Sequence, residues 1–215
     1  MSKRDPETTR RKLLEAAFAE IQHRGFAGAS LDAILRSAKV TKGALYHHFP
    51  SKSALGYAVV DELVGQAVRN QWVRPLQNAE DPITGLQDTI RAQLAERPLH
   101  EVELEAPAIR LSQELSNQDE EFRKRLDNVM TVWRGGIAAT LSRGQRDGTV
   151  RNDVDVHRVA AFIVAAIAGI QATAKSARSA DQLRSNVEIL SAYLQGLRAT
   201  PNRFSTATSQ ALQAQ

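Results

Sequence analysis

Apolar residues recur at every third or fourth position along most of this chain, a spacing that places them on one face of an α-helix. The first such pattern begins with Asp5 as a helix cap and Pro6 at the first helical position. Its apolar residues are Leu13, Leu14, Ala17, Phe18 and Ile21. Gly25 stops the pattern, so we expect a helix from Pro6 to Arg24, with Phe26 folded back against its last turn.

Two shorter patterns follow, separated by only a few residues. Ser30 caps the first and Thr41 caps the second, which Pro50 ends. Ser51 then caps a third start, with Lys52 in its first turn. The apolar residues of the two short patterns are Leu31, Ile34, Leu35 and Ala38, then Leu45 and Phe49. Two short helices joined by a tight turn predict a helix-turn-helix.

The rest of the chain reads as helices separated by residues that start or stop them. The expected helices run from Leu55 to Trp72, from Pro82 to near Pro98, from Pro107 through Leu115, over a long stretch ending at Gly148, and from caps at Asp155 and Asp181 toward Pro201. Gly135 and Gly136 within the long helix indicate that another backbone comes close. No run predicts a strand: Leu99 to Glu105 is interpreted as a loop and residues 201–215 as a disordered tail.

We therefore expect an all-α protein, with an N-terminal three-helix helix-turn-helix domain at residues 1–53 and a larger helical domain at 54–200. The most apolar stretch, Val159 to Ile170, holds a dozen residues, whereas a bilayer needs about 20. A helix that is apolar all round is buried on every side, so we expect this stretch in a helical interface and not in a membrane. The polar residues 1–12 lack the pattern of a signal peptide, which predicts a cytoplasmic protein. The absence of cysteine excludes disulfides.

Charge is unevenly distributed along the chain. The first 53 residues carry ten Lys or Arg against five Asp or Glu, whereas the remaining residues carry 18 against 19. A basic domain attached to a neutral body is the electrostatic footprint of phosphate binding. Gly43 and Ala44 at the front of the second short helix would let its backbone approach DNA closely. A helical hairpin with a tolerated glycine is the alternative for this segment alone, and the segregated charge argues against it.

The run T-K-G-A-L-Y-H-H-F-P-S-K, residues 41–52, resembles the recognition motif of the tetracycline-repressor (TetR) family of transcription regulators. The resemblance extends upstream through the opening helix. It implies that Lys42, Gly43 and Ala44 face base edges of double-stranded DNA, and that Tyr46, His48 and Lys52 reach phosphates. His47 would contact a base or a phosphate, and Ser30 and Thr41 would each place a phosphate at a helix N-terminus.

The resemblance further implies a homodimer whose last two long helices pair across a two-fold axis, so that two recognition helices read a pseudo-palindromic operator. The residues expected in this interface are Phe162, Ile163, Ile167, Ile170, Val187, Leu190 and Leu194. Relatives hold a small-molecule effector in the C-terminal half, and candidates for that pocket are Trp72, Arg110, Gln113, Trp133, Phe162 and Gln171. Little charge is buried there, so an apolar or aromatic effector is expected to release a repressor from DNA.

Two other functions stay open on the sequence: an architectural protein that coats DNA without sequence preference, and an all-helical enzyme with a DNA-binding head. The acids and histidines form no set of nucleophile, base and orienting group, so we expect no catalytic residues and no enzyme. His47 and His48 are adjacent and diverge on a helix, and no third ligand stands at metal spacing. We therefore expect neither a metal nor a cofactor.

Overall fold

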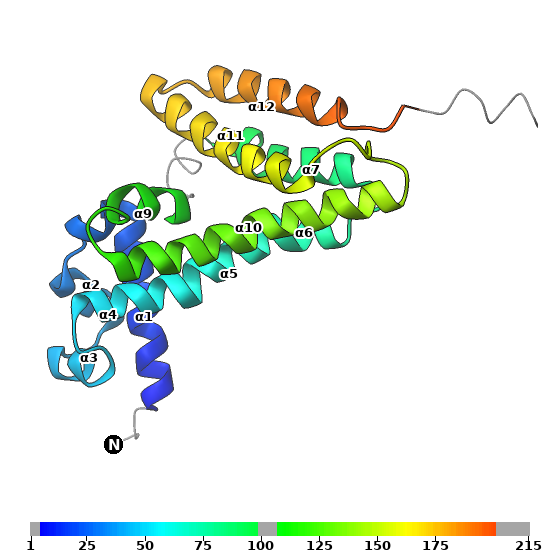
Figure 1. The fold of residues 1–215 in the computed structure, drawn as a ribbon. Helices are drawn as coiled ribbons and strands as arrows, with labels where there is room; N and C mark the ends of the chain where they lie inside the picture. The colour runs from blue at the N-terminus through cyan, green and yellow to red at the C-terminus, as the bar shows by residue number, and fades with distance from the viewer. Residues whose placement is uncertain (1–4, 99–106, 201–215) are drawn as a thin grey trace, which may run out of the picture.

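A computed structural model describes residues 5–98 and 107–200, and nearly all of these residues are helical. In this part of the chain there is no strand, and one isolated β-bridge joins Val150 to Arg198. Figure 1 shows the N-terminal helices gathered at one end of an elongated body, with α11 (Val156–Ala177) and α12 (Ala180–Gln195) along the other. The predicted all-α fold is confirmed, whereas the loop at Leu99 to Glu105 and the tail at 201–215 lie outside the described residues.

Three helices, α1 (Pro6–Gly28), α2 (Leu31–Ala38) and α3 (Lys42–His48), make the N-terminal end. Asp5, Ser30 and Thr41 cap them as predicted, each through a side-chain oxygen that accepts a backbone N–H bond. Their shared core holds Leu13, Ala17, Ile21, Ile34, Leu45 and Phe49. Capping and apolar spacing are local properties, and here they define the helices correctly.

Gly25 interrupts α1 as predicted, with φ 74° and ψ 173°, a conformation that is essentially restricted to glycine. The chain then makes one more turn before Ala29. Phe26, expected to fold back against the last turn of α1, packs its ring against Phe122 of α10 (Glu120–Arg146), with ring centroids 4.7 Å apart. The side chain expected to close a helix end instead joins two parts of the molecule.

A long helical stretch leads from the N-terminal end into the body. It comprises α4 (Lys52–Ala58), η1 (Val59–Val64), α5 (Gly65–Val68), η2 (Arg69–Val73) and α6 (Arg74–Gln77), of which the η segments are π-helical. The predicted end at Trp72, ahead of Arg74 and Pro75, is wrong. In the wide turn before the proline, Arg74 donates its N–H to the carbonyl of Arg69, and this turn lets the helix pass a residue that has no N–H to donate.

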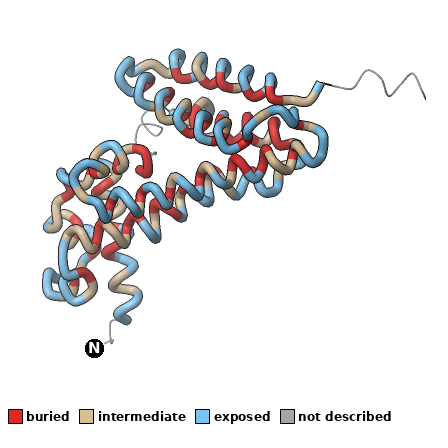
Figure 2. The backbone as a smooth tube through the Cα atoms, in the orientation of Figure 1, coloured by how far each residue is buried: buried red, intermediate tan, exposed pale blue. Residues whose placement is uncertain are grey.

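The body is built around α10, which packs against α9 (Pro107–Leu115), α7 (Pro82–Ile90) and α11. The π-helical η3 (Arg91–Ala95) extends α7. Figure 2 shows buried positions along the inward side of α10, and these include Phe122, Leu126, Val129, Trp133, Ile137 and Leu141. Of the two glycines expected to meet another backbone, Gly136 faces the side chain of Val73, while nothing lies within 4 Å of a Cβ built at Gly135.

The last two helices differ from expectation in two respects. Asp155 caps α11 as predicted, but Ser179 caps α12, and Asp181 instead pairs with Arg184 inside the first turn. By length and composition, α11 is the one described helix that could cross a membrane, because its 22 residues exceed the apolar stretch seen in the sequence. Its Ile163 and Ile167 are buried in the body, as in a core helix.

Within one subunit α11 is buried on one side only, so its burial on every side stays a prediction for the dimer. Ala161, Phe162, Ala165 and Gly169 are exposed on α11 and form an apolar face that the subunit does not cover. Composition could not reveal this, because both faces of the helix are apolar and only packing against α10 and α12 selects the inner one.

Candidate DNA-binding surface and regulatory body

The helix α3 turns two chemically different faces in opposite directions. Leu45 and the following Phe49 are buried, whereas Lys42, Gly43 and Tyr46 are exposed. Tyr46 keeps 44% of its surface accessible, and a Cβ built at Gly43 would meet no atom within 4 Å. An exposed helix with small residues and a lysine in its first turn has the shape and charge to enter the major groove of DNA.

The predicted hydroxyl contacts are engaged as helix caps. Ser30 Oγ accepts the N–H of Ala33 at 3.3 Å, and Thr41 Oγ1 accepts the N–H of Ala44 at 3.3 Å. Each hydroxyl keeps its own proton, which remains available for donation to a phosphate oxygen. The cap and a phosphate contact are therefore compatible at both positions.

Lys52 has partners inside the subunit. Its Nζ donates to the carbonyl of Ala27 at 3.2 Å and lies 5.0 Å from the centroid of the Phe26 ring. An ammonium group has three donors, so a phosphate at this position would share Lys52 with Ala27. Lys52 therefore links the first turn of α4 to the turn of α1 beyond Gly25.

The two histidines of α3 diverge, with ring centroids 5.3 Å apart and ring planes inclined by 71°. His47 is exposed and His48 is half-buried. Within residues 5–98 and 107–200, no group of three or more His, Cys, Asp or Glu side chains is placed to hold a metal ion.

A groove between α1 and α3 was not predicted from the sequence. Its volume is about 430 Å³, and it is lined by Asp5, Pro6, Thr8, Thr9, Lys12, Lys39, Val40, Ala44, His47 and His48. The basic run at residues 10–12 was a possible signal for it. Only the tertiary packing of α1 beside α3 brings Lys12 and Lys39 to one depression next to the recognition helix.

The helix α9 holds the broken helix α1 on both sides of its break. Arg110 donates from Nη1 to the carbonyl of Gln22 at 2.6 Å, and the Glu114 carboxylate accepts the N–H groups of Phe26 at 3.0 Å and Ala27 at 2.6 Å. The break at Gly25 leaves these backbone groups without helical partners, and α9 supplies them. Arg110, predicted in an effector pocket, instead lies at this junction.

A second junction joins α4 to the start of α10. Tyr57 donates its hydroxyl proton to Asp119 at 2.8 Å, and this bond raises the pKa of Tyr57. Asp119 also caps α10, and these backbone N–H bonds, together with Tyr57, lower its pKa. Arg125 pairs with Asp61 and lies 5.2 Å from the centroid of the Tyr57 ring. Nothing in the local sequence around these residues indicates their contact.

The residues predicted for an effector pocket are not gathered in one place. Trp72 and Trp133 are buried side by side, with ring centroids 4.7 Å apart, and Gln171 is half-buried on α11. Gln113 and Phe162 face outward, so their assignment to an enclosed pocket is corrected. Trp133 Nε1 and Gln171 Oε1 are buried without a hydrogen-bond partner among the described residues.

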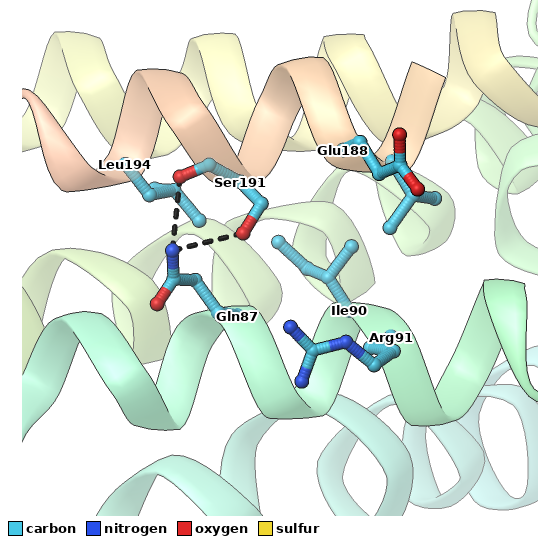
Figure 3. Close-up of a pocket in the computed structure, with 7 residues that line it drawn as sticks. Gln87, Ile90, Arg91, Glu188, Ser191 and Leu194 are labelled. Carbon is cyan, nitrogen blue, oxygen red and sulfur yellow. Dashed lines mark hydrogen bonds between the residues drawn. The ribbon is translucent and has the colours of Figure 1, made fainter. Parts of the chain in front are cut away.

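A hollow of about 140 Å³ lies between α7 and α12 (Figure 3). Gln87 donates to the carbonyl and hydroxyl oxygens of Ser191 at 2.9 and 2.8 Å, and it accepts a bond from Gln195 at 3.0 Å. Arg91 and Glu188 are exposed at the edge of the hollow. Because the nitrogen and the oxygen of the Gln87 amide are both bonded to α12, this cluster fastens α12 to α7.

Six of the seven residues predicted for the dimer interface are buried within the subunit: Ile163, Ile167, Ile170, Val187, Leu190 and Leu194. Their side chains have little accessible surface for a partner, at most 8% at Ile170, because they pack between α11, α12 and the rest of the body. Phe162 is the exception, with 50% of its surface exposed. The exposed apolar face of the two helices consists of Phe162, Ile189 and Tyr193, and the two aromatic ring centroids lie 5.0 Å apart.

Two family models match the chain, and both describe this architecture. Residues 13–59 match the tetR family of bacterial regulatory proteins, and residues 107–190 match the tetracyclin repressor-like C-terminal domain. The chain is 29% identical to the A-factor receptor protein of Streptomyces griseus. The alignment covers 83% of this chain but only 59% of that relative. It is 28% identical to the HTH-type transcriptional repressor NemR of Escherichia coli over 69% of this chain and 72% of NemR.

Among solved structures, a TetR transcriptional regulator from Chloroflexus aurantiacus superimposes with a TM-score of 0.79 at 26% identity, covering 91% of this chain and 98% of that one. The matched N-terminal region contains α3 and the caps of α2 and α3, and the matched C-terminal region runs from α9 into α12. Motif, helical order and overall shape agree, and the chain belongs to the TetR family of bacterial regulatory proteins.

Proposed function

We propose that this chain is a transcriptional repressor that binds a palindromic operator as a homodimer and leaves it when a small molecule binds the helical body. The observation that carries this proposal is the exposed face of α3, where Lys42, Gly43 and Tyr46 stand free of the subunit. Relatives named as HTH-type regulators and repressors support the class. The DNA contacts we propose are Ser30, Thr41, Lys42, Gly43, Ala44, Tyr46, His47, His48 and Lys52.

The proposed dimer uses the outer face of α11 and α12. Ile189 has 67% of its surface exposed and lies on the same face as Phe162 and Tyr193. Large apolar side chains grouped on one surface of a monomer are typical of an association site. A two-fold axis through this face would project both recognition helices from one dimer, as reading of two half-sites requires.

The proposed effector is apolar or aromatic with a polar edge. A buried donor or acceptor without a partner costs about 1–3 kcal/mol, and among the described residues Trp133 Nε1 is such a donor and Gln171 Oε1 such an acceptor. A ligand that accepts from the indole and donates to the amide would remove both costs. Such a ligand would favour whichever arrangement of the helices exposes these two atoms to it.

We also propose where the protein acts in the cell and how the chain is divided into domains. The chain acts in the cytoplasm, residues 1–53 form the DNA-binding domain, and residues 54–200 form the regulatory and dimerisation domain. The homology to regulators supports a role without catalysis. Because the long helix that begins at Lys52 crosses the proposed boundary, movement of the body would be passed directly to the DNA-binding end.

Selection of bound duplexes from a random pool tests the function. We expect one palindrome to be enriched and to bind at least about 10³-fold more tightly than a random duplex. Lys42→Ala should change which bases are preferred, while Lys124→Ala, which alters an exposed lysine on α10, should not. Equal affinity for all duplexes would favour a DNA-coating protein, and turnover of a small molecule would favour an enzyme.

A further inference from the structure

Lys39 adopts a backbone conformation that is unfavourable for most residues that carry a side chain. It ends α2 in the left-handed region, with φ 55° and ψ 44°. Among the described residues, only Lys39 and Arg178 combine a positive φ with a side chain other than that of glycine. Glycine would occupy both positions without strain. A lysine that keeps a strained conformation invites a functional explanation.

The position of Lys39 suggests that explanation. It comes two residues before Thr41, the cap of α3, and lines the groove between α1 and α3. Lys12 of α1 lines the same groove, beside Thr8 and Thr9. His47 and His48 contribute from α3, so one wall of the groove is the recognition helix itself.

The two lysines of the groove are not compensated by the subunit. The side chains of Lys12 and Lys39 form no hydrogen bond or ion pair with another described residue, whereas the arginines of α1 do: Arg10 pairs with Glu62, Arg11 with Glu15, and Arg24 with Glu20.

The one acid that lines the groove, Asp5, is occupied as the cap of α1. Its carboxylate accepts from the N–H of Glu7 at 3.2 Å and from the hydroxyl of Thr8 at 2.9 Å. Two lysines with unpaired side chains and one carboxylate therefore line the groove, and this excess of positive charge favours an anion.

We propose that the groove between α1 and α3 seats the sugar-phosphate backbone of the operator, with Lys39 and Lys12 each contacting a phosphate. This inference rests on the proposed DNA-binding function and adds to it two contacts that carry no sequence information. Phosphate contacts fix the register and orientation of a protein on a duplex. With these two lysines bound to phosphates beside it, α3 would enter the major groove at a defined depth and angle.

The size of the effect follows from counterion release. Each phosphate neutralised contributes about 0.9 to the slope of log K against log salt concentration, so one lysine in each subunit contributes about 1.8 to a dimer. Relative to 1 M salt, a slope of about 1.8 corresponds to about a 30-fold change in affinity at 0.15 M salt. Because the contact is to phosphate, the preference for the selected palindrome over other sequences should be retained.

Lys39→Gly separates this role from a structural one, and Arg178→Gly is its matched control at the other left-handed position. Both substitutions relieve strain, so both melting temperatures should equal that of the wild type or exceed it by up to about 4 °C. Titration of the palindrome selected from the random pool, by fluorescence anisotropy from 50 to 300 mM salt, should show the 30-fold loss and the smaller slope for Lys39→Gly alone. Lys39→Asn, which also tolerates the left-handed region, should behave like Lys39→Gly.

Unchanged affinity and salt slope in Lys39→Gly and Lys12→Gln would overturn the inference while leaving the proposed function intact. An equal loss of affinity in Arg178→Gly would also overturn it, because the effect would then come from backbone relief. Failure of the wild-type protein to enrich any duplex is a different result, and it would count against the proposed function itself.

Discussion

Removing the Glu114 carboxylate should detach α9 from the broken end of α1. In Glu114→Ala, the backbone N–H groups of Phe26 and Ala27 lose the acceptor that they share. The break at Gly25 prevents α1 from supplying a replacement, because the peptide groups on either side of it point in different directions. Water can reach Ala27, which is exposed, more easily than Phe26, which is half-buried.

The magnitude follows from these two bonds. A hydrogen bond to a charged group contributes about 1.5–3 kcal/mol, and the more exposed bond is partly replaced by water. We therefore expect a loss of about 2 kcal/mol in the free energy of unfolding. For a chain of this length, that loss lowers the melting temperature by roughly 4–8 °C.

Thermal unfolding at a fixed protein concentration, together with amide hydrogen exchange, measures both consequences. The variant should melt at the lower temperature, and exchange should accelerate at Phe26 and Ala27 before it does in the rest of α1. Gln113→Ala is the control, because Gln113 is exposed on the same helix next to Glu114. A melting temperature within about 1 °C of the wild type, with unchanged exchange at both amides, would show that Glu114 does not hold the broken end of α1.

Three further predictions follow from other parts of the structure. Gly25→Ala should lower the free energy of unfolding by at least about 2 kcal/mol in urea denaturation, because its backbone conformation is glycine-specific and the new Cβ would lie 2.7 Å from Glu114 Oε2; an unchanged midpoint would contradict this. The hydrogen bond from Arg198 lowers the pKa of Asp81 to about 2 from 3.8, so its contribution to stability is present above pH 4 and disappears as the pH falls through 2. The difference in melting temperature between wild type and Asp81→Asn should therefore shrink between pH 4 and pH 2, and a constant difference would rule this out. Ile189→Glu should yield a monomer by light scattering, whereas Val132→Glu, at an exposed apolar position on α10, should leave a dimer; a dimer in both would exclude the proposed interface.

Local signals in the sequence were reliable where the physics is local. A cap at Asp5, Ser30 or Thr41 depends on a side chain and on an N–H two or three residues away, so residue type and spacing suffice to place it. The same signals misled where two of them competed. Asp181 has a capping side chain, but Ser179 two residues earlier has the extended backbone that a cap requires, and α12 begins there.

The helical fold, the recognition helix and its basic surroundings follow from local sequence, because apolar spacing, capping residues and the run at 41–52 each lie within a few helical turns. It could not choose between two apolar faces of one helix: Ile163 and Phe162 are neighbours of similar character, and only packing turned one inward and the other outward. Glu114 and Ala27 meet across 87 positions, and Lys12 and Lys39 face one groove from separate helices. Such pairings depend on how the helices cross, which is a property of the whole packed core and cannot be read from any local stretch of sequence.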